Sequence, residues 1–438
     1  MTKLILFCYS KKYLQYKPLK PLFLSSTNNQ IFQMKVLHTS DWHLGKTLYD
    51  KKRYDEFDSF LSWLTGFIIK EKIDTLLISG DVFDTTAPSN RAQTLYYNFL
   101  KKMTATPCRH IVITGGNHDS PSFLEAPKKI LRILDIHVVA SISDHLAEEI
   151  IPLTNEQGET KAIVCAVPFL RDRDIRSAEP GESPDDKARK LISNIAQHYR
   201  EVAAMAHQQR QDKSIPVIGM GHLFTQKGKT TEGDGVRELY VGTAAHVDGQ
   251  DISQGFDYMA LGHLHVAQKV DGTEHVRYCG SPIPIGFGEA RQEKKVIVAS
   301  FEGSKPIITE HHIPCFQKLH KISGTLGRVS AEIKALANDG SDAWLEVEIT
   351  EAVPAALITA KLDEMLRDSK MEILRIKNKK VIDRALQQNH NEEKLETMND
   401  RDVFIRCLEA NEIPEENRNQ LLETYKEAIF GMQNQEKV

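Results

Sequence analysis

Two hydrophobic periodicities alternate along the chain from Met34 onward. Short apolar runs, such as residues 75–79 and 110–113, have the length and composition of strands buried in a parallel sheet. Between them lie stretches in which apolar residues recur at helical spacing, first over residues 54–68 and then over residues 91–103. Strand and helix in alternation predict an α/β fold, in which helices cover a parallel sheet.

Further apolar runs follow, with fewer helical stretches between them. They predict a second sheet packed on the first. The polar and charged stretch at residues 177–190 is expected to be a surface loop. The strands expected from all these runs are residues 35–38, 75–79, 110–113, 163–166, 216–220, 258–261, 276–279 and 296–301.

The pattern changes after about Pro314. Residues 344–349 alternate as a half-buried strand, residues 355–366 have helical spacing, and residues 371–376 resemble another strand. A small α+β domain fits this order. The expected organisation is a non-core, poorly ordered extension at residues 1–33, a main domain at 34–314, the small domain at 315–385, a polar linker at 386–400 and a pair of short amphipathic helices at 401–438.

Polar residues of a few kinds follow strand after strand. Ligand sites of open α/β sheets lie just beyond the carboxyl ends of strands, and Asp81 stands there behind the tight exit that Gly80 allows. Asp, Asn and His without Cys suit a cation such as Mn²⁺ or Fe²⁺, with Zn²⁺ as an alternative. We therefore expect Asp81 to bridge two metal ions. The polar residues at these strand exits are Asp41, His43, Asp81, Asp84, Asn117, His118, Asp119, His222, His263 and His265.

Each of these signals has a simpler explanation when it is taken alone. Asp81 could cap a helix or close a turn, and His222 could be a hydrogen-bonded core histidine at a strand end. Pairs such as Asp-x-His or Gly-His also occur often by chance. Their succession, each just beyond an expected strand, favours a metal centre. Histidines outside this context keep the simpler explanation; they are His198, His207, His246, His311, His312 and His320.

The ordered set of motifs resembles the calcineurin-like metallophosphoesterase superfamily and, within it, the SbcD family of DNA-repair nucleases. The motifs are Asp-x-His at 41–43, Gly-Asp-x-x-Asp at 80–84, Gly-Asn-His-Asp at 116–119, Gly-His at 221–222 and Gly-His-x-His at 262–265. The segment from Met34 to Lys46 resembles the opening of that family, and the loop from Tyr278 resembles its loop after the last metal ligands. The likeness extends from Met34 to the C-terminus. It implies a two-sheet α/β/β/α sandwich with a small capping domain and a C-terminal helix pair.

The resemblance also implies a role for each strand-exit residue. His118 would contact the scissile phosphate, and the Asp84 carboxylate would orient the His118 ring. The metals would be two divalent ions, Mn²⁺ first and Mg²⁺ as the alternative. One ion would be held by Asp41, His43, Asp81 and His265, and the other by Asp81, Asn117, His222 and His263.

Partners follow from the same resemblance. It implies cleavage of DNA ends, hairpins and single strands, by a homodimer within a heterotetramer that contains an SbcC-type ABC ATPase. The ATPase would come from the partner, because the Gly-Lys-Thr at 228–230 lacks the first glycine of a P-loop, where Leu223 stands. Residues 401–438 are expected to dock on the coiled coil of that partner.

Two sets of side chains are candidates for contacts with these partners. The aromatic stripes of the first two helices could form the homodimer contact, with core packing as the alternative; they are Tyr54, Phe57 and Phe60, and Tyr96, Phe99 and Met103. The candidate contacts to DNA phosphates, each of which could equally be an ordinary solvated cation, are Arg171, Arg173, Arg176, Lys318, Lys321 and Arg328.

Composition changes this interpretation little. The net charge is 56 − 60 = −4, so no global basic field indicates nucleic acid, but DNA binding needs only a local basic face. The 6 cysteines are scattered and contain no Cys-x-x-Cys, which favours a reducing, cytoplasmic compartment. No apolar run of about 20 residues is present, so we expect no membrane-spanning helix.

Two other functions fit the same fold. A phosphoprotein phosphatase or small-molecule phosphodiesterase is the first, but protein phosphatases usually continue the second motif with Arg-Gly and end the third with Glu, where this chain has Thr85, Thr86 and Asp119. The second is a non-catalytic scaffold, a class that typically loses metal ligands, whereas this chain keeps every expected one. Nuclease activity is therefore the preferred hypothesis.

Overall fold

The computed structural model describes residues 34–175, 182–225, 228, 247–378, 404, 405, 408, 418 and 421–426. The predictions for residues 1–33 and 386–400 lie outside these residues, as does most of the expected helix pair at 401–438. Within the described part, no helix is both long enough and apolar enough to cross a bilayer.

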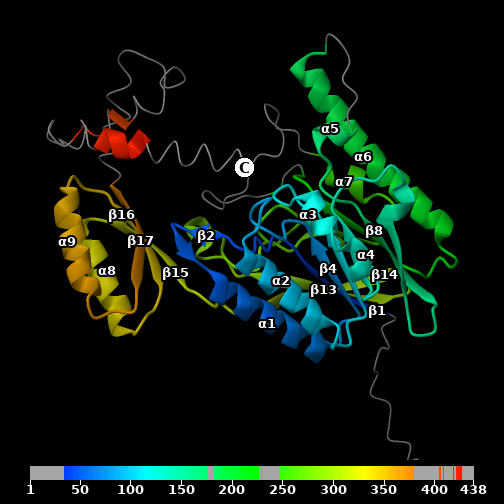
Figure 1. The fold of residues 1–438 in the computed structure, drawn as a ribbon, viewed down its shortest axis with the longest axis horizontal. Helices are drawn as coiled ribbons and strands as arrows, with labels where there is room; N and C mark the ends of the chain where they lie inside the picture. The colour runs from blue at the N-terminus through cyan, green and yellow to red at the C-terminus, as the bar shows by residue number, and fades with distance from the viewer. Residues whose placement is uncertain are drawn as a thin grey trace, which may run out of the picture. The chain divides into compact units, whose positions relative to one another are not determined.

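The first sheet, of which Figure 1 labels β1, β4, β13 and β14, has the strand order β14-β13-β1-β4-β5-β6. Its parallel half consists of β1 (Met34–Thr39), β4 (Thr75–Ser79), β5 (His110–Thr114) and β6 (Ile136–Val139), and the antiparallel β13 (Lys295–Glu302) and β14 (Lys305–His312) complete it. Helices α1 (Tyr54–Glu71) and α2 (Asn90–Met103) pack on the outer face, where Leu76 and Ile78 of β4 point. Every residue of β4 is buried, as its unbroken apolar run predicts.

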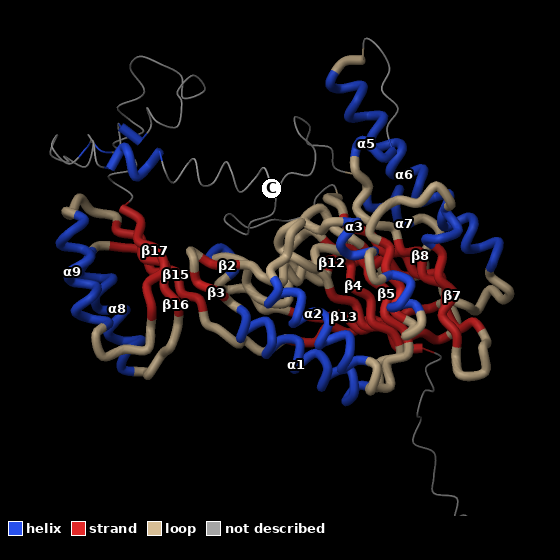
Figure 2. Tube along the Cα trace, viewed as in Figure 1, coloured by secondary structure: helices blue, strands red, loops and turns tan. Residues whose placement is uncertain are grey.

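The second sheet has the order β11-β12-β10-β9-β8-β7. Its strands are β7 (Ile150–Thr154), β8 (Thr160–Ala166), β9 (Val217–His222), β10 (Tyr258–Gly262), β11 (Gln268–Lys269) and β12 (Val276–Tyr278). Helix α6 (Pro184–Gln209) packs on its outer face, while Val164 and Met220 face Leu77 of the first sheet across a shared apolar layer. The two-sheet α/β/β/α sandwich is therefore confirmed, and so are the predicted strands of both sheets (Figure 2).

A separate three-stranded parallel sheet follows, with the order β15-β16-β17. Its strands are β15 (Leu319–Gly324), β16 (Trp344–Ile349) and β17 (Glu372–Asn378), and α8 (Leu326–Asn338) and α9 (Ala355–Leu366) share an apolar core with them. The predicted strand at 344–349 and helix at 355–366 are found with the same bounds. The remaining short elements are β2 (Thr47–Leu48), β3 (Lys51–Lys52), α3 (Pro121–Glu125), α4 (Lys128–Arg132), η1 (Leu146–Glu149), α5 (Asp172–Ile175), α7 (Gly249–Ser253) and η2 (Phe287–Glu289).

The surface loop expected at 177–190 is wrong over its second half, because α6 begins at Pro184. Ser183 caps the helix: its hydroxyl accepts a hydrogen bond from the Asp186 main chain, and the Asp186 carboxylate accepts one from the Ser183 main chain. Serine, then proline at the first helical position, then an acidic residue is a helix start. The sequence analysis missed this helix start because the stretch is rich in polar and charged residues.

The aromatic stripes of α1 and α2 belong to the core of the chain itself. Phe57 and Phe60 are fully buried, and Tyr96, Phe99 and Met103 are each 1% exposed. Trp42 packs edge-on against Phe60 and Phe99 between these helices and the sheet. The expectation that these five side chains contact a second copy is therefore wrong, and the alternative of core packing holds for them; Tyr54 is half-buried and packs against the same core.

Burial makes one histidine of this fold sensitive to pH. His38 lies fully buried between the sheets with Nδ1 3.0 Å from the Tyr258 hydroxyl, and burial, assisted by Arg277, lowers the pKa of His38 to about 3. The unfolded chain binds this proton near pH 6.5 and the folded chain does not. The free energy of unfolding should therefore fall as the pH drops below 6.5, by up to about 1.4 kcal/mol per pH unit from this group.

We expect His38→Gln to flatten the decline in unfolding free energy between pH 6.5 and 5, measured by urea denaturation at each pH. The exposed His145 supplies the control, because His145→Gln should keep the wild-type slope. Equal slopes for the wild type and His38→Gln would contradict the prediction.

Candidate metal centre

The polar residues expected at the strand exits meet at one end of the sandwich. Strands of both sheets end there: β1, β4 and β5 of the first, and β9 and β10 of the second. The loops that follow them gather at this end (Figure 2). The three groups of side chains that could share a cation here are Asp41, His43 and His265; His43, Asp81 and His118; and Asp81, His222 and His263.

Asp81 lies in the middle of these groups. Its Oδ2 is 3.6 Å from His43 Nε2 on one side and 3.3 Å from His222 Nε2 on the other, while its Oδ1 accepts a 2.9 Å hydrogen bond from the His118 main chain. Burial alone would raise the pKa of the Asp81 carboxyl group, but His222 and His43 lower it well below its usual range. Asp81 is therefore an ionised carboxylate that faces both halves of the centre.

The first half of the centre brings imidazole nitrogens face to face. His43 Nε2 and His265 Nε2 are 3.2 Å apart. His265 Nδ1 lies 3.1 Å from Glu289 Oε1, and an ionised carboxylate can only accept, so Nδ1 carries a proton; burial opposes a charge on the ring, but Glu289 outweighs it and raises the pKa of His265. Asp41 belongs to the same group, and its Oδ1 accepts a 2.8 Å hydrogen bond from the His263 main chain. One of the two facing imidazole nitrogens carries the proton of this contact, and a divalent cation bound among these atoms would replace that proton.

The second half contains a buried nitrogen without a hydrogen-bond partner, His263 Nε2. Burial, with the nearby charge of His222, lowers the pKa of His263 well below its usual range, so the ring is neutral and can donate a lone pair. His222 Nδ1 donates to the Ser79 carbonyl at 3.0 Å, and His222 Nε2 lies 3.0 Å from Asn117 Oδ1. The orphaned nitrogen and the mixed N and O donors fit a divalent cation of the manganese or zinc class.

The backbone at these strand exits is strained. Asp41, His43, Asp81 and His263 have φ of +52°, +46°, +49° and +100°, in a region that L-residues other than glycine seldom adopt. Each such residue costs on the order of 1–3 kcal/mol, which the surrounding fold must offset. Strain that recurs at residue after residue of one site indicates that side-chain position is maintained at the expense of stability.

Glycines allow the loops to approach so closely. A Cβ at Gly80, whose φ is +81°, would lie 2.2 Å from His222 Nδ1, and a Cβ at Gly116 would lie 2.2 Å from Asp81 Oδ1. Both glycines are therefore required by the packing of the loops against the donor side chains.

The expected contact between Asp84 and His118 is made by a different atom. His118 Nδ1 lies 2.8 Å from the main-chain oxygen of Asp84, and the Asp84 carboxylate lies instead beside His43 Nδ1 and Lys46 Nζ, at 3.5 and 3.1 Å. Burial opposes ionisation, but His43 and Lys46 outweigh it and lower the pKa of Asp84 to about 2. The carbonyl fixes His118 Nδ1 as a donor, and the carboxylate orients His43 rather than His118.

Sequence reasoning missed two residues that support the centre. Glu289 and Lys294 form a buried ion pair, and Glu289 also accepts hydrogen bonds from His265 and from the Ser281 hydroxyl. Burial opposes ionisation of Glu289, but Lys294 and His265 lower its pKa to about 2. The pair follows no recognisable motif, so only the fold reveals it.

Asp119 stands out in the sequence only as part of its motif. Its carboxylate accepts hydrogen bonds from the main chains of Val82, Phe83 and Gly116, at 3.1, 2.9 and 2.9 Å. It therefore ties the loop that carries Asp81 to the loop that carries Asn117, a role that explains why an acidic side chain closes the third motif.

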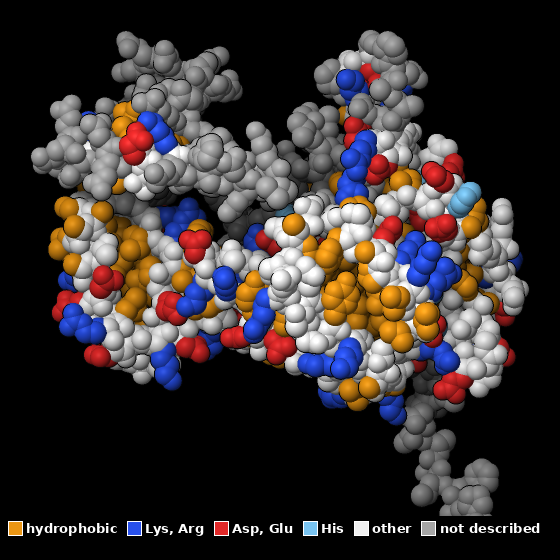
Figure 3. Space-filling model, viewed as in Figure 1, with side chains coloured by type: hydrophobic (Ala, Val, Ile, Leu, Met, Phe, Trp, Pro, Cys, Tyr) orange, Lys and Arg blue, Asp and Glu red, His pale blue; other side chains and the backbone are white. Residues whose placement is uncertain are grey.

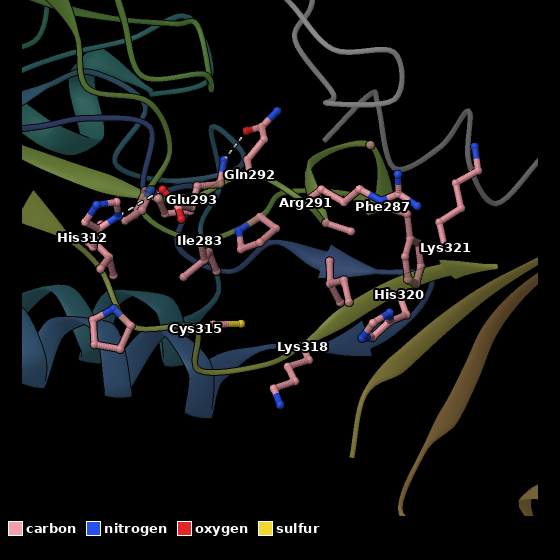
Figure 4. Close-up of a pocket in the computed structure, with 18 of the residues that line it drawn as sticks. Ile283, Phe287, Arg291, Gln292, Glu293, His312, Cys315, Lys318, His320 and Lys321 are labelled. Carbon is pink, nitrogen blue, oxygen red and sulfur yellow. Dashed lines mark hydrogen bonds and ion pairs between the residues drawn. The ribbon is translucent and has the colours of Figure 1, made fainter. Parts of the chain in front are cut away.

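The candidate phosphate contacts fall in two places. Arg171 donates from Nη2 to the main-chain oxygen of Asp119 at 3.3 Å, Arg173 is exposed, and Arg176 lies outside the described residues. A cavity of about 1080 Å³ is lined by Lys318, Lys321 and Arg328 (Figure 4). Arg291 also lines it, and sequence reasoning missed this residue. Its other walls include Ile283 and, at the start of η2, Phe287, two residues before Glu289.

Comparisons with known proteins found matches over most of this chain. The model of the family "Calcineurin-like phosphoesterase" matches residues 34–267, and that of "Type 5 capsule protein repressor C-terminal domain" matches residues 315–412. The chain is 34% identical to the SbcD subunit of nuclease SbcCD from Escherichia coli K12 over 391 residues, which cover 89% of this chain and 96% of that protein. Proteins of the same name in Rhodobacter capsulatus and Bacillus subtilis are 34% and 29% identical, over 64% and 73% of this chain and 69% and 80% of theirs.

The support that Glu289 gives to His265 predicts a loss of metal affinity without it. We expect Glu289→Gln to weaken Mn²⁺ binding by about 10–100-fold, because His265 loses the acceptor that fixes its tautomer. Unpairing Lys294 should also lower the free energy of unfolding by about 3–5 kcal/mol. Free Mn²⁺ measured by electron paramagnetic resonance gives the affinity.

The control for this substitution is the neighbouring Glu293, whose side chain is 74% exposed. Glu293→Gln should bind Mn²⁺ as the wild type does. Unchanged Mn²⁺ affinity in folded Glu289→Gln would show that Glu289 does not position a ligand.

Proposed function

The chain belongs to the calcineurin-like phosphoesterases and, within them, to the SbcD family of nuclease SbcCD; from this premise we propose that it hydrolyses DNA phosphodiester bonds with two divalent metal ions at the Asp81 centre. The observation that carries the proposal is the position of Asp81 Oδ2 between His43 and His222, with a buried, unpartnered nitrogen of His263 nearby. The relatives favour this over a phosphoprotein or small phosphodiester substrate.

Two ions, which we propose to be Mn²⁺ with Mg²⁺ as the alternative, would occupy the two halves of the centre. Bound there, they supply Lewis-acid stabilisation of the phosphate and activation of a water nucleophile. Asp81 would be shared between them. The residues that would hold the first ion are Asp41, His43, Asp81 and His265, and those for the second are Asp81, Asn117, His222 and His263.

His118 is the proposed catalytic side chain that is not a metal ligand. The Asp84 carbonyl accepts the hydrogen bond from Nδ1 and so orients the ring, which lies edge-on to His43 with ring centroids 4.8 Å apart. Its main-chain N–H donates a hydrogen bond to Asp81, which fixes the backbone of His118 beside the centre. We infer that Nε2 contacts the scissile phosphate and protonates the leaving oxygen.

DNA would reach the centre past the cavity beside the small domain. Lys318, Arg291 and Arg328 line it, are exposed to solvent, and have no carboxylate partner among the described residues. Lys321, by contrast, forms ion pairs with Glu346 and Glu348, with Nζ 3.8 and 3.7 Å from their carboxylate oxygens. Several unneutralised cations around one hollow favour a polyanion, and we propose that they contact DNA phosphates.

A second copy of the chain is proposed to pack on α2 and α4. Figure 3 shows hydrophobic side chains gathered on this face, and Ile130, Ile133 and Leu134 are 68%, 82% and 48% exposed, with Tyr97 of α2 at 37%. A contiguous exposed apolar patch is costly in water unless it is covered. This surface replaces the buried aromatic stripes as the proposed homodimer contact.

The names of the relatives support the proposal of an ATPase partner. They are named as subunits of SbcCD, and we propose that this chain assembles in the same way, with residues 401–438 docking on the coiled coil of an SbcC-type ATPase. In the described part of that tail, the Phe404 and Tyr425 rings stack with centroids 4.1 Å apart, as expected of paired helices. The free Cys108, Cys165, Cys279 and Cys315 are consistent with the cytoplasm as the proposed location.

Two variants should distinguish the residues needed for metal binding from the residue needed only for catalysis. Asp81→Asn should lose both Mn²⁺ binding and cleavage of end-labelled linear and hairpin DNA. His118→Gln should still bind Mn²⁺ but cut about 10²–10⁴-fold more slowly, because only the proton transfer is removed. His145→Gln is the surface control and should cut normally. Wild-type cleavage rates in either active-site variant would contradict the proposed two-metal mechanism.

The cavity cations should contribute to DNA affinity through counterion release. We expect the double variant Lys318→Ala/Arg328→Ala to bind DNA more weakly and to reduce the slope of log K against log salt by about 1 for each cation removed. Lys213→Ala/Lys305→Ala removes two exposed lysines elsewhere and should leave the slope unchanged. The same loss of slope in both pairs would mean that the cavity has no special role.

Native mass spectrometry tests the assembly. The wild type should have the mass of two chains and Ile133→Glu that of one, whereas Leu357→Glu on the exposed side of α9 should stay dimeric. Removal of residues 401–438 should abolish the complex with the ATPase and leave Mn²⁺-dependent cleavage of single-stranded DNA. A dimeric Ile133→Glu, or a complex that survives the truncation, would contradict the corresponding surface.

A further inference from the structure

A second group of metal-ligating side chains lies at the other end of the sandwich. His110, Asp135 and His137 each place one donor atom within 4.8 Å of the others. His110 is the first residue of β5, Asp135 precedes β6, and β5 and β6 pair in parallel. β5 is 5 residues long and leads to Asn117 at its far end, so at about 3.3 Å per residue this group is at least about 13 Å from the candidate metal centre.

His110 presents a buried donor atom that nothing in the fold uses. The residue is 3% exposed, and its Nε2 lies 2.8 Å from the carbonyl oxygen and 3.2 Å from the main-chain nitrogen of Thr154, the last residue of β7 in the opposite sheet, with the carbonyl the shorter contact. When Nε2 donates to this carbonyl, Nδ1 keeps a lone pair, and Nδ1 is buried without a hydrogen-bond partner. A metal ligand whose other nitrogen donates to a main-chain carbonyl is the usual arrangement of a histidine in a metal site.

The other two members have the chemistry and freedom of ligands. Burial, with the charges of His110 and Arg132, lowers the pKa of His137 to about 4, so its ring is neutral at physiological pH. Asp135 is exposed, with φ +55°, and adds a carboxylate. Donor atoms around tetrahedral Zn²⁺ lie about 3.3 Å apart, so rotation of the two less buried side chains has to close the group by up to about 1.5 Å.

We propose that His110, Asp135 and His137 bind a divalent cation of the zinc class, with water completing the coordination. Two histidines and one carboxylate form a donor set for Zn²⁺. The ion would join the edge strand β6 to β5, and through the Thr154 contact of His110 to the edge strand β7 of the second sheet. It is a structural site, which holds together the end of the sandwich away from the candidate metal centre.

Nearby charges set the limits of this site. Asp74 lies close enough to His110 for their charges to interact, and its negative charge favours a cation. Arg132 acts in the opposite direction, because its positive charge helps to lower the pKa of His137 and would repel an ion. The local balance therefore suits an ion held by strong nitrogen donors rather than one held by charge alone.

The test counts metal equivalents on the full-length chain. Protein loaded with Zn²⁺ at micromolar concentration is gel-filtered, and its zinc is measured by inductively coupled plasma mass spectrometry. We expect His137→Ala and Asp135→Asn each to hold one equivalent fewer than the wild type. Asparagine tolerates the left-handed backbone of residue 135, and His137 is half-buried, so both variants should fold. Zn²⁺ should also raise the Tm of the wild type more than that of either variant.

His145→Ala is the matched control and should hold the same number of equivalents as the wild type. The count is a difference between variants, so it tests this site whether or not the Asp81 centre binds metal or cuts DNA. Equal zinc content and equal Tm shifts in the wild type and both folded variants would overturn the proposal. So would a difference that appears only at millimolar Zn²⁺.

Discussion

A buried carboxylate, Asp81, is the constraint around which the two sheets are joined. Its Oδ2 lies between His43 from the first sheet and His222 from the second, and its Oδ1 holds the main chain of His118. An ionised group that is 1% exposed is costly to bury unless positive charge or hydrogen bonds surround it. The sheets can therefore approach here only because the strand exits bring imidazoles and main-chain donors to this one side chain.

The cost of that arrangement is distributed over the neighbouring structure. Four donor residues adopt positive φ, and Gly80 and Gly116 leave room for His222 and Asp81. Behind the donors, Asp119 ties two loops together and the Glu289–Lys294 pair fixes His265. The fold therefore keeps the donor side chains in place at the cost of backbone strain, and a cation bound among them would offset part of that cost through coordination.

The surfaces proposed for DNA and for a second copy lie on different parts of the chain. Unneutralised cations line the cavity beside the small domain, whereas the apolar residues lie on helices of the main domain. The zinc-class site proposed at His110 lies at yet another place, the end of β5 opposite Asn117. Substrate, second copy and structural ion therefore need not compete for one surface.

The strands, a second sheet and the polar residues at the strand exits were predictable from sequence, because each depends on local order, an apolar run followed by polar residues. The full α/β/β/α arrangement and the role of each polar residue came instead from the resemblance of the motifs to a known family. Helix α6 was also encoded locally, in Ser183, Pro184 and Asp186, but was concealed by charge. The remaining features were decided by tertiary structure. The stripes with Phe57 and Phe99 have one helical spacing whether they face a core or a partner, and packing alone chose the core. His118 meets the Asp84 carbonyl rather than its carboxylate, and Glu289 reaches His265 across a loop, because such contacts depend on where distant backbone segments lie in space.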